Sequence, residues 1–231
     1  MWSCLLALGL VAALQVPCLA VTSSESREIV DKHNELRRKV RPTASDMQKM
    51  SWNSGTASSA QRVANACTQK HSSTSCGENL YMSTNKKSWS AAIQKWYDEV
   101  SNWRYGVGSY NGKVVGHFTQ VVWAKSNTIG CGMAYCPNQK YKYYYVCQYC
   151  PAGNYGYARP YTPGKACASC SGACDDGLCL SGGKTPSKPN PVKPSGGKTC
   201  PKDRVFGCSL LVKLGCGWVT HSLCPTSCCN K

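Results

Sequence analysis

Two histidines and two glutamates are the residues of this 231-residue chain whose side chains could act together at one site. Imidazole and carboxylate groups bind zinc and related divalent ions, and the same groups serve as general acids and bases. The four are spread over 47 positions, so their spacing alone does not show that they converge. Metal binding and acid/base chemistry are both open for the set His71, Glu78, Glu99 and His117.

His117 lies in the stretch Gly116-His-Phe-Thr-Gln-Val-Val-Trp123, whose alternation predicts a half-buried strand. His117 is therefore either a core histidine or one ligand of a shared site. His33 lies on the apolar stripe of a helix predicted over 25–40, with no acidic or Cys/His partner one turn away. We interpret His33 as a packed core histidine rather than a ligand.

The loop that carries His71 and Glu78 contains Cys76 and Gly77 between them. A disulfide from Cys76 would fix this loop, and Gly77 would permit a close approach of another segment. Glu99 follows Trp96 by three residues and precedes Trp103 by four, so its carboxylate is expected on the core-facing side of a helix. These elements would position the four side chains around a cleft.

The remaining pattern predicts helices followed by clustered strands, which is typical of an α/β sandwich of about 130–140 residues. In the second helix, small residues form a stripe that would let it lie close against a sheet. The predicted helices span 25–40, 54–69 and 88–104, and the predicted strands span 115–124, 129–135 and 141–149.

Residues 1–20 are interpreted as a cleaved secretory signal, because a short apolar run is followed by small side chains at Cys18 and Ala20. No segment is long enough to span a bilayer. Sixteen cysteines remain in an exported chain, which predicts eight disulfides. The competing interpretation is a zinc ribbon, since two Cys-x-x-Cys pairs, 147/150 and 167/170, lie sixteen residues apart.

The net charge of +16 favours anionic partners such as cell membranes, channel mouths or sulfated glycans, and an exported protein is not expected to bind nucleic acid. The predicted organisation is a sandwich over 21–160, a disulfide-held hinge over 161–179, a Gly/Pro/Lys-rich linker over 180–199 and a six-cysteine unit over 200–231. Residues 180–231 carry eight basic side chains and one acidic.

Two motifs, Gly116–Trp123 and Tyr144–Tyr155, resemble the signatures of the CAP superfamily. The run Cys147–Asn154, followed by ten further cysteines, is similar to the cysteine-rich secretory proteins of venoms, oral glands and reproductive tracts. The resemblance implies an α-β-α sandwich, a disulfide-rich hinge and a small helical C-terminal domain like the ShK toxin. It implies a divalent metal, zinc by preference and not required for folding, on His71 and His117 with Glu78 and Glu99 beside them.

The resemblance also implies a complete set of disulfides. In the sandwich and hinge these are Cys67–Cys136, Cys76–Cys150, Cys131–Cys147, Cys167–Cys174 and Cys170–Cys179. In the C-terminal domain they are Cys200–Cys229, Cys208–Cys224 and Cys216–Cys228. Three features depart from the family pattern: the loop between His71 and Cys76 is shorter than in many relatives, the linker is an insertion, and Cys228 and Cys229 are adjacent.

The function expected from this resemblance is a secreted, monomeric modulator or blocker of a cation channel that acts through its basic C-terminal domain. The expected channel contacts are Lys202, Arg204, Phe206, Lys213 and Trp218. Binding of sterols, lipids or heparan sulfate is one alternative. A hydrolase in the cleft is another, but Ser72, Ser73 and Thr119 lie in no nucleophile motif, so we expect no enzymatic activity.

Overall fold

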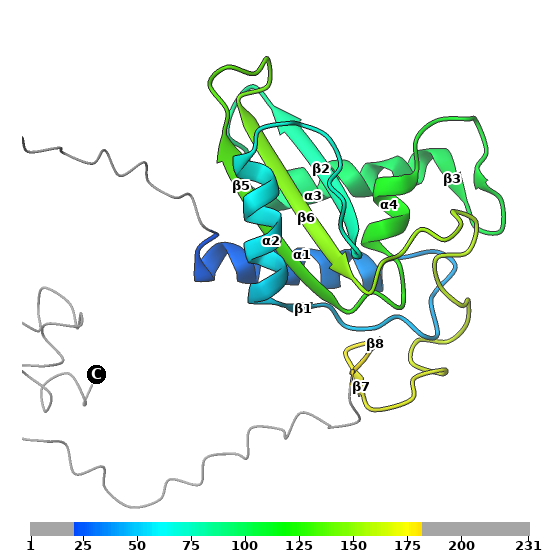
Figure 1. Cartoon of the computed structure of the whole chain (residues 1–231). Coiled ribbons are helices and arrows are strands. Elements are labelled where there is room, and N and C mark those ends of the chain that lie inside the picture. The colour runs from blue at the N-terminus through cyan, green and yellow to red at the C-terminus, as the bar shows by residue number, and fades with distance from the viewer. Residues whose placement is uncertain (1–20, 182–231) are drawn as a thin grey trace, which may run out of the picture. The chain divides into compact units, whose positions relative to one another are not determined.

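The computed structural model describes residues 21–181 (Figure 1). The expected signal peptide, nearly all of the expected linker and the segment 200–231 lie outside the described residues. The three disulfides and the channel contacts expected in that last segment therefore stay predictions. Among the helices in 21–181, none combines the length and the hydropathy needed to cross a membrane.

A four-stranded sheet forms the middle layer, in the order β1-β5-β6-β2. Its strands are β1 (Ser51–Trp52), β2 (Gly77–Ser83), β5 (Thr128–Tyr135) and β6 (Tyr143–Cys150). The pairs β5–β6 and β2–β6 are antiparallel, and β1 joins β5 in parallel. Because β6 is buried on both faces, its side chains enter two separate cores.

One face of the sheet is covered by α2 (Ser54–Asn65), which Figure 1 shows in front of β5 and β6. The small side chains Ala60 and Ala64 are fully buried here against Tyr144 and Val146. Glycine is required opposite them: a Cβ on Gly130 would lie 2.0 Å from the backbone nitrogen of Ala57. The predicted close approach of this helix to a sheet is confirmed.

The opposite face carries α1 (Ser23–Arg38), α3 (Trp89–Tyr97) and α4 (Gly116–Val121), as Figure 1 shows. A capping box between Thr22 and Glu25 starts α1, as short polar side chains do at helix N-termini. The larger core lies between these helices and the sheet, with Ile29, Ile93 and Phe118 almost fully buried. Helices on both faces make the α-β-α sandwich that was expected.

The prediction of a strand over 115–124 is wrong, because Gly116–Val121 is the helix α4. The apolar residues of this short stretch fit helical spacing as well as they fit strand alternation. Phe118, Val121 and Val122 lie three and four residues apart along the chain, as on one face of a helix, and all three are buried. Periodicity cannot separate helix from strand in so short an apolar run.

Other elements also differ from the prediction, and α2 ends at Asn65 rather than at residue 69. The helix predicted over 88–104 ends at Tyr97 and continues as a 3-10 helix, η1 (Asp98–Asn102), before β3 (Trp103–Arg104), which pairs with β4 (Gly108–Ser109). The sequence does not predict the strand β2, because Gly77–Ser83 contains no β-branched residue and its first residues lie in the expected His71–Asn79 loop.

The hinge is a small disulfide-linked unit with one hairpin, β7 (Cys174–Asp175) and β8 (Leu178–Cys179). Five disulfides lie in the described residues, and they are the five pairings that the resemblance implied there: Cys67–Cys136, Cys76–Cys150, Cys131–Cys147, Cys167–Cys174 and Cys170–Cys179. The zinc-ribbon interpretation is wrong, because all four of its cysteines are consumed in these bonds.

Candidate functional site

His117 is paired with Glu99 at the start of α4. Its Nδ1 lies 2.6 Å from Glu99 Oε1, and since a carboxylate can only accept, the imidazole donates through Nδ1–H. In the neutral ring the lone pair is then on Nε2, which has no hydrogen-bond partner among the described residues. The His117 side chain is 30% exposed, so solvent or a ligand can reach it.

Glu99 has a second role, because α4 has no capping side chain of its own. The other carboxylate oxygen, Oε2, accepts from the backbone nitrogens of His117 at 2.9 Å and Phe118 at 3.2 Å. These are orphan donors of the first helical turn, where negative charge is favoured. Glu99 therefore fixes the start of the helix and the orientation of the imidazole together.

The second pair is His71 and Glu78, with His71 Nδ1 3.1 Å from Glu78 Oε1. Here the carboxylate is buried, with 4% of its side chain exposed, whereas the imidazole is 63% exposed. Glu78 also accepts from the backbone nitrogen and the hydroxyl of Ser72 and from Gln148 Nε2, at 2.7–3.0 Å. It thus ties the 71–76 loop to the sheet while leaving the imidazole at the surface.

One residue of each pair lies on β2 or α4, which adjoin: Glu78 is on β2 and His117 is on α4. His71 is in the loop before β2, and Glu99 is on η1. Asn79, next to Glu78, donates from Nδ2 to the backbone oxygen of His117 at 3.0 Å. A Cβ on Gly77 would lie 2.0 Å from Gln120 Oε1, so the predicted close approach at this glycine is confirmed. The structure brings the four expected residues together as two pairs; in residues 21–181 no three His, Cys, Asp or Glu side chains form a group that could hold a metal.

His33 is a core residue, as interpreted from the sequence. It is fully buried, donates from Nδ1 to the Ile29 oxygen at 2.8 Å and accepts at Nε2 from the Tyr149 hydroxyl at 2.9 Å. Burial, with a smaller contribution from the Arg37 charge, lowers the pKa of His33 to about 4. It is neutral at physiological pH, and both of its nitrogens are occupied.

Sequence reasoning missed the polar residues that support the pairs. Ser72, Asn79 and Gln148 are ordinary residue types whose partners are distant in sequence, so no local signal marks them. Arg37 was also missed: it is 1% exposed and donates to the backbone oxygens of five residues, Gln48, Val121, Trp123, Ala124 and Ser126. This buried guanidinium holds the chain that follows α4.

The nearby hydroxyls do not contact either cleft imidazole. Ser72 Oγ donates to Glu78 Oε2 at 2.7 Å, and Thr119 Oγ1 donates to Asn154 Oδ1 at 2.7 Å. A serine or threonine nucleophile would instead be bonded to its base. The arrangement suits orientation of two imidazoles better than activation of a nucleophile.

Comparison of this chain with known proteins shows its family. The profile described as "CAP: Cysteine-rich secretory protein family" matches residues 30–149. Human cysteine-rich secretory protein 3 is 55% identical over 177 residues, which cover 72% of this chain and 72% of that protein. The chain belongs to the cysteine-rich secretory protein family. Guinea-pig (Cavia porcellus) cysteine-rich secretory protein 2 is 54% identical over 173 residues, 70% of each chain.

Solved structures agree on the fold of this family member. The crystal structure of NaASP2 with Zn²⁺ is 29% identical, with a TM-score of 0.59, and the match covers 69% of this chain and 97% of that one. BmVAL-1 is 26% identical with a TM-score of 0.60, over 71% of this chain and 97% of that one.

Proposed function

We propose that this protein is a secreted modulator of a cation channel and acts through its C-terminal segment, residues 200–231. The observation that carries the proposal is a sequence one: in a chain of this family, residues 180–231 have a net charge of +7. Of this, +3 belongs to the six-cysteine unit 200–231 and the rest to four lysines of the linker. A disulfide-linked cationic unit of 32 residues suits the mouth of a cation-selective pore, where lysine and aromatic side chains can bind.

The proposal includes a divalent metal in the cleft, with zinc as the preferred ion. Each carboxylate accepts from Nδ1 of its histidine, which is the arrangement that orients a metal-binding imidazole and raises its basicity. His71 and His117 would therefore offer Nε2, and solvent would complete the coordination. The related structure that was solved with Zn²⁺ supports this assignment.

No catalytic reaction is assigned to the cleft. The hydroxyls of Ser72 and Thr119 donate to Glu78 and Asn154 rather than to a histidine. A proteolytic activity that persists through repurification and disappears in His117→Ala would contradict this part of the proposal.

Patch-clamp recording across a panel of cation channels tests the channel assignment. Full-length protein is expected to reduce current through at least one channel, and a chain that ends at Ser181 is expected to have no effect there. In the full chain, exchanging Lys202, Arg204 and Lys213 for Gln should weaken the block about tenfold or more, because charge complementarity is lost.

The matched control is exchange of the linker residues Lys184, Lys188 and Lys193 for Gln, which removes the same charge from the 180–199 segment. This variant is expected to retain the block. Equal loss in the two triple variants would show that total charge, not the C-terminal unit, is responsible. Absence of any effect of the full chain across the panel would overturn the proposal.

A further inference from the structure

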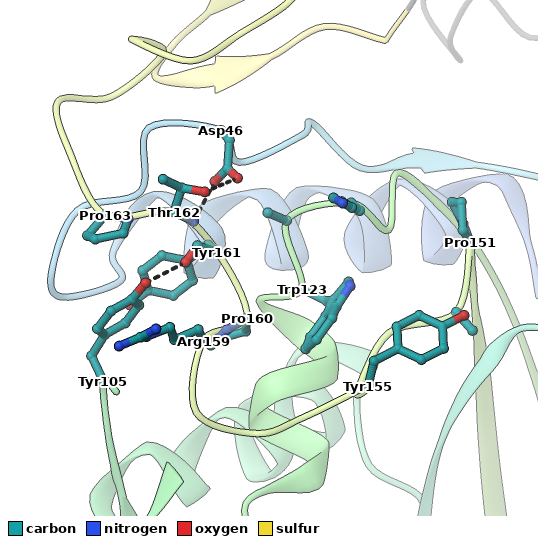
Figure 2. Close-up of a pocket in the computed structure, with 13 residues that line it drawn as sticks. Asp46, Tyr105, Trp123, Pro151, Tyr155, Arg159, Pro160, Tyr161, Thr162 and Pro163 are labelled. Atoms are coloured by element: carbon teal, nitrogen blue, oxygen red, sulfur yellow. Dashed lines mark hydrogen bonds between the residues drawn. The ribbon is translucent and has the colours of Figure 1, made fainter. Parts of the chain in front are cut away.

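A pocket of about 770 Å³ lies outside the imidazole–carboxylate cleft. It is formed by the chain after α4, the segment that follows β6, the turn between β3 and β4, and the loop after α1 (Figure 2). Figure 2 shows Trp123 between Tyr155 on one side and Arg159 and Pro160 on the other, with Tyr105 and Tyr161 beyond them. Its volume is in the range of small-molecule sites.

Aromatic rings line both ends of this pocket. Trp123 and Tyr155 form an edge-to-face pair with centroids 6.2 Å apart, and Tyr155 is 85% exposed. At the other end the rings of Tyr105 and Tyr161 are 5.3 Å apart. So exposed a tyrosine beside a tryptophan offers a surface for a flat apolar group.

The lining of the pocket carries a net positive charge, with two basic side chains against one acidic side chain. Between Glu99 and Asp175 the sequence contains no acidic residue and seven basic ones: Arg104, Lys113, Lys125, Lys140, Lys142, Arg159 and Lys165. Of these, Lys125 and Arg159 line the pocket, and neither forms an ion pair within the described part of the chain. Asp46 is the acidic residue of the lining, and its two oxygens already accept from the nitrogen and hydroxyl of Thr162.

The walls are held in place without a ligand. Arg37 donates to the backbone oxygens of Trp123 and Ala124, and the Ala124 nitrogen donates to the Pro160 oxygen at 2.9 Å. The Tyr105 hydroxyl donates to the Tyr161 oxygen at 2.8 Å. A site that is already formed loses less conformational entropy when a ligand binds.

We propose that this pocket binds a flat apolar anion: an aromatic or polycyclic ring system that carries a sulfonate, sulfate or carboxylate. The rings of Trp123 and Tyr155 would contact the apolar body. The guanidinium of Arg159, with Lys125 at the rim, would bind the anionic group through charge-assisted hydrogen bonds. A cationic ligand of the same shape is disfavoured by these uncompensated charges.

Two dyes of nearly the same shape test the proposal on the full mature chain. 1-Anilinonaphthalene-8-sulfonate carries the anionic group, and N-phenyl-1-naphthylamine lacks it. Their affinities are measured by fluorescence titration for the parent, Arg159→Gln and Tyr155→Ser. The matched control is Lys140→Gln with Tyr141→Ser, a cation over a tyrosine ring at 5.6 Å that lies outside the pocket. Denaturation midpoints confirm that each variant is folded.

The parent is expected to bind the sulfonate at least about tenfold more tightly than the neutral dye. Arg159→Gln should lower affinity for the sulfonate about tenfold and leave the neutral dye within about twofold. Tyr155→Ser should lower the affinity for both dyes, and the control variant should change neither affinity. The proposal is overturned if the sulfonate does not bind, if Arg159→Gln weakens both dyes equally, or if the control variant loses as much affinity as the pocket variants.

Discussion

The core around His33 and the cleft around His117 place the same side chain in opposite settings. His33 has no exposed surface, and its two nitrogens are bonded to a backbone oxygen and a phenol. His117 is partly exposed, and its one bonded nitrogen faces a carboxylate. Asn79 joins the two regions, since its Nδ2 lies 3.4 Å from the Tyr149 hydroxyl and also donates to His117. An imidazole becomes a candidate ligand through its carboxylate partner and its free nitrogen.

The largest effect is expected from pH at His33. Above pH 6.5 the ring is neutral in the folded and unfolded states, so it imposes no penalty. As pH falls from 6.5 towards 4, the unfolded chain takes up a proton that the folded core excludes, because the pKa of His33 in the fold is about 4. Stability should fall by about 3 kcal/mol over this window and the contribution should level off below it.

Urea denaturation at pH values between 7 and 4 measures the slope of the free energy of unfolding against pH. His33→Gln should flatten this slope. Because the slope is compared rather than the absolute stability, the test holds even if the variant is less stable. An unchanged slope in His33→Gln would show that the core histidine is not the group responsible.

The next largest effect is expected at Glu99. Glu99→Gln should lower the free energy of unfolding by about 2 kcal/mol. Both carboxylate oxygens of Glu99 accept hydrogen bonds, one from the α4 backbone and one from His117, whereas an amide has only one oxygen that can accept. Asp98→Asn removes the same charge one residue away at an exposed position and should cost less than about 0.5 kcal/mol. Equal losses of stability in the two variants would show that Glu99 does not cap α4.

The sequence predicted the parts of the molecule whose signals are local. The stripe of small residues in α2, the strand-like runs at 129–135 and 141–149 and the isolation of His33 on its helix were all sufficient. The strand prediction for 115–124 failed because the conformation of Gly116–Val121 depends on Glu99, which lies on another element. In the same way, the four cleft residues were predicted as a set, but their division into two pairs is set by contacts between β2, α4 and η1 that no spacing reveals.

A smaller effect is expected for metal binding when the outer partner of one imidazole is changed. Glu78→Gln should lower zinc affinity about tenfold, since the amide is a poorer acceptor for His71 Nδ1–H. Isothermal titration with zinc measures this, and Glu35→Gln is the control, because within the described residues its carboxylate pairs with Lys32 and Lys39 and not with a histidine. Identical affinities in the two variants would contradict the role of Glu78.

The smallest effect is expected on stability at His71. Its ring is 63% exposed, so His71→Ala should change the free energy of unfolding by less than about 0.5 kcal/mol. Denaturant unfolding at pH 7 measures it. A loss of 2 kcal/mol or more would mean that this ring supports the loop, as Glu78 does, rather than being available to a ligand.

The central claim is that the sandwich with its cleft is a scaffold and that channel modulation is a property of the C-terminal segment. Current block by the full-length double variant His71→Ala/His117→Ala tests it most directly, recorded beside the parent with zinc binding measured on the same samples. The account predicts that zinc binding is lost while the block is equal to that of the parent. Loss of the block in a folded double variant would contradict it.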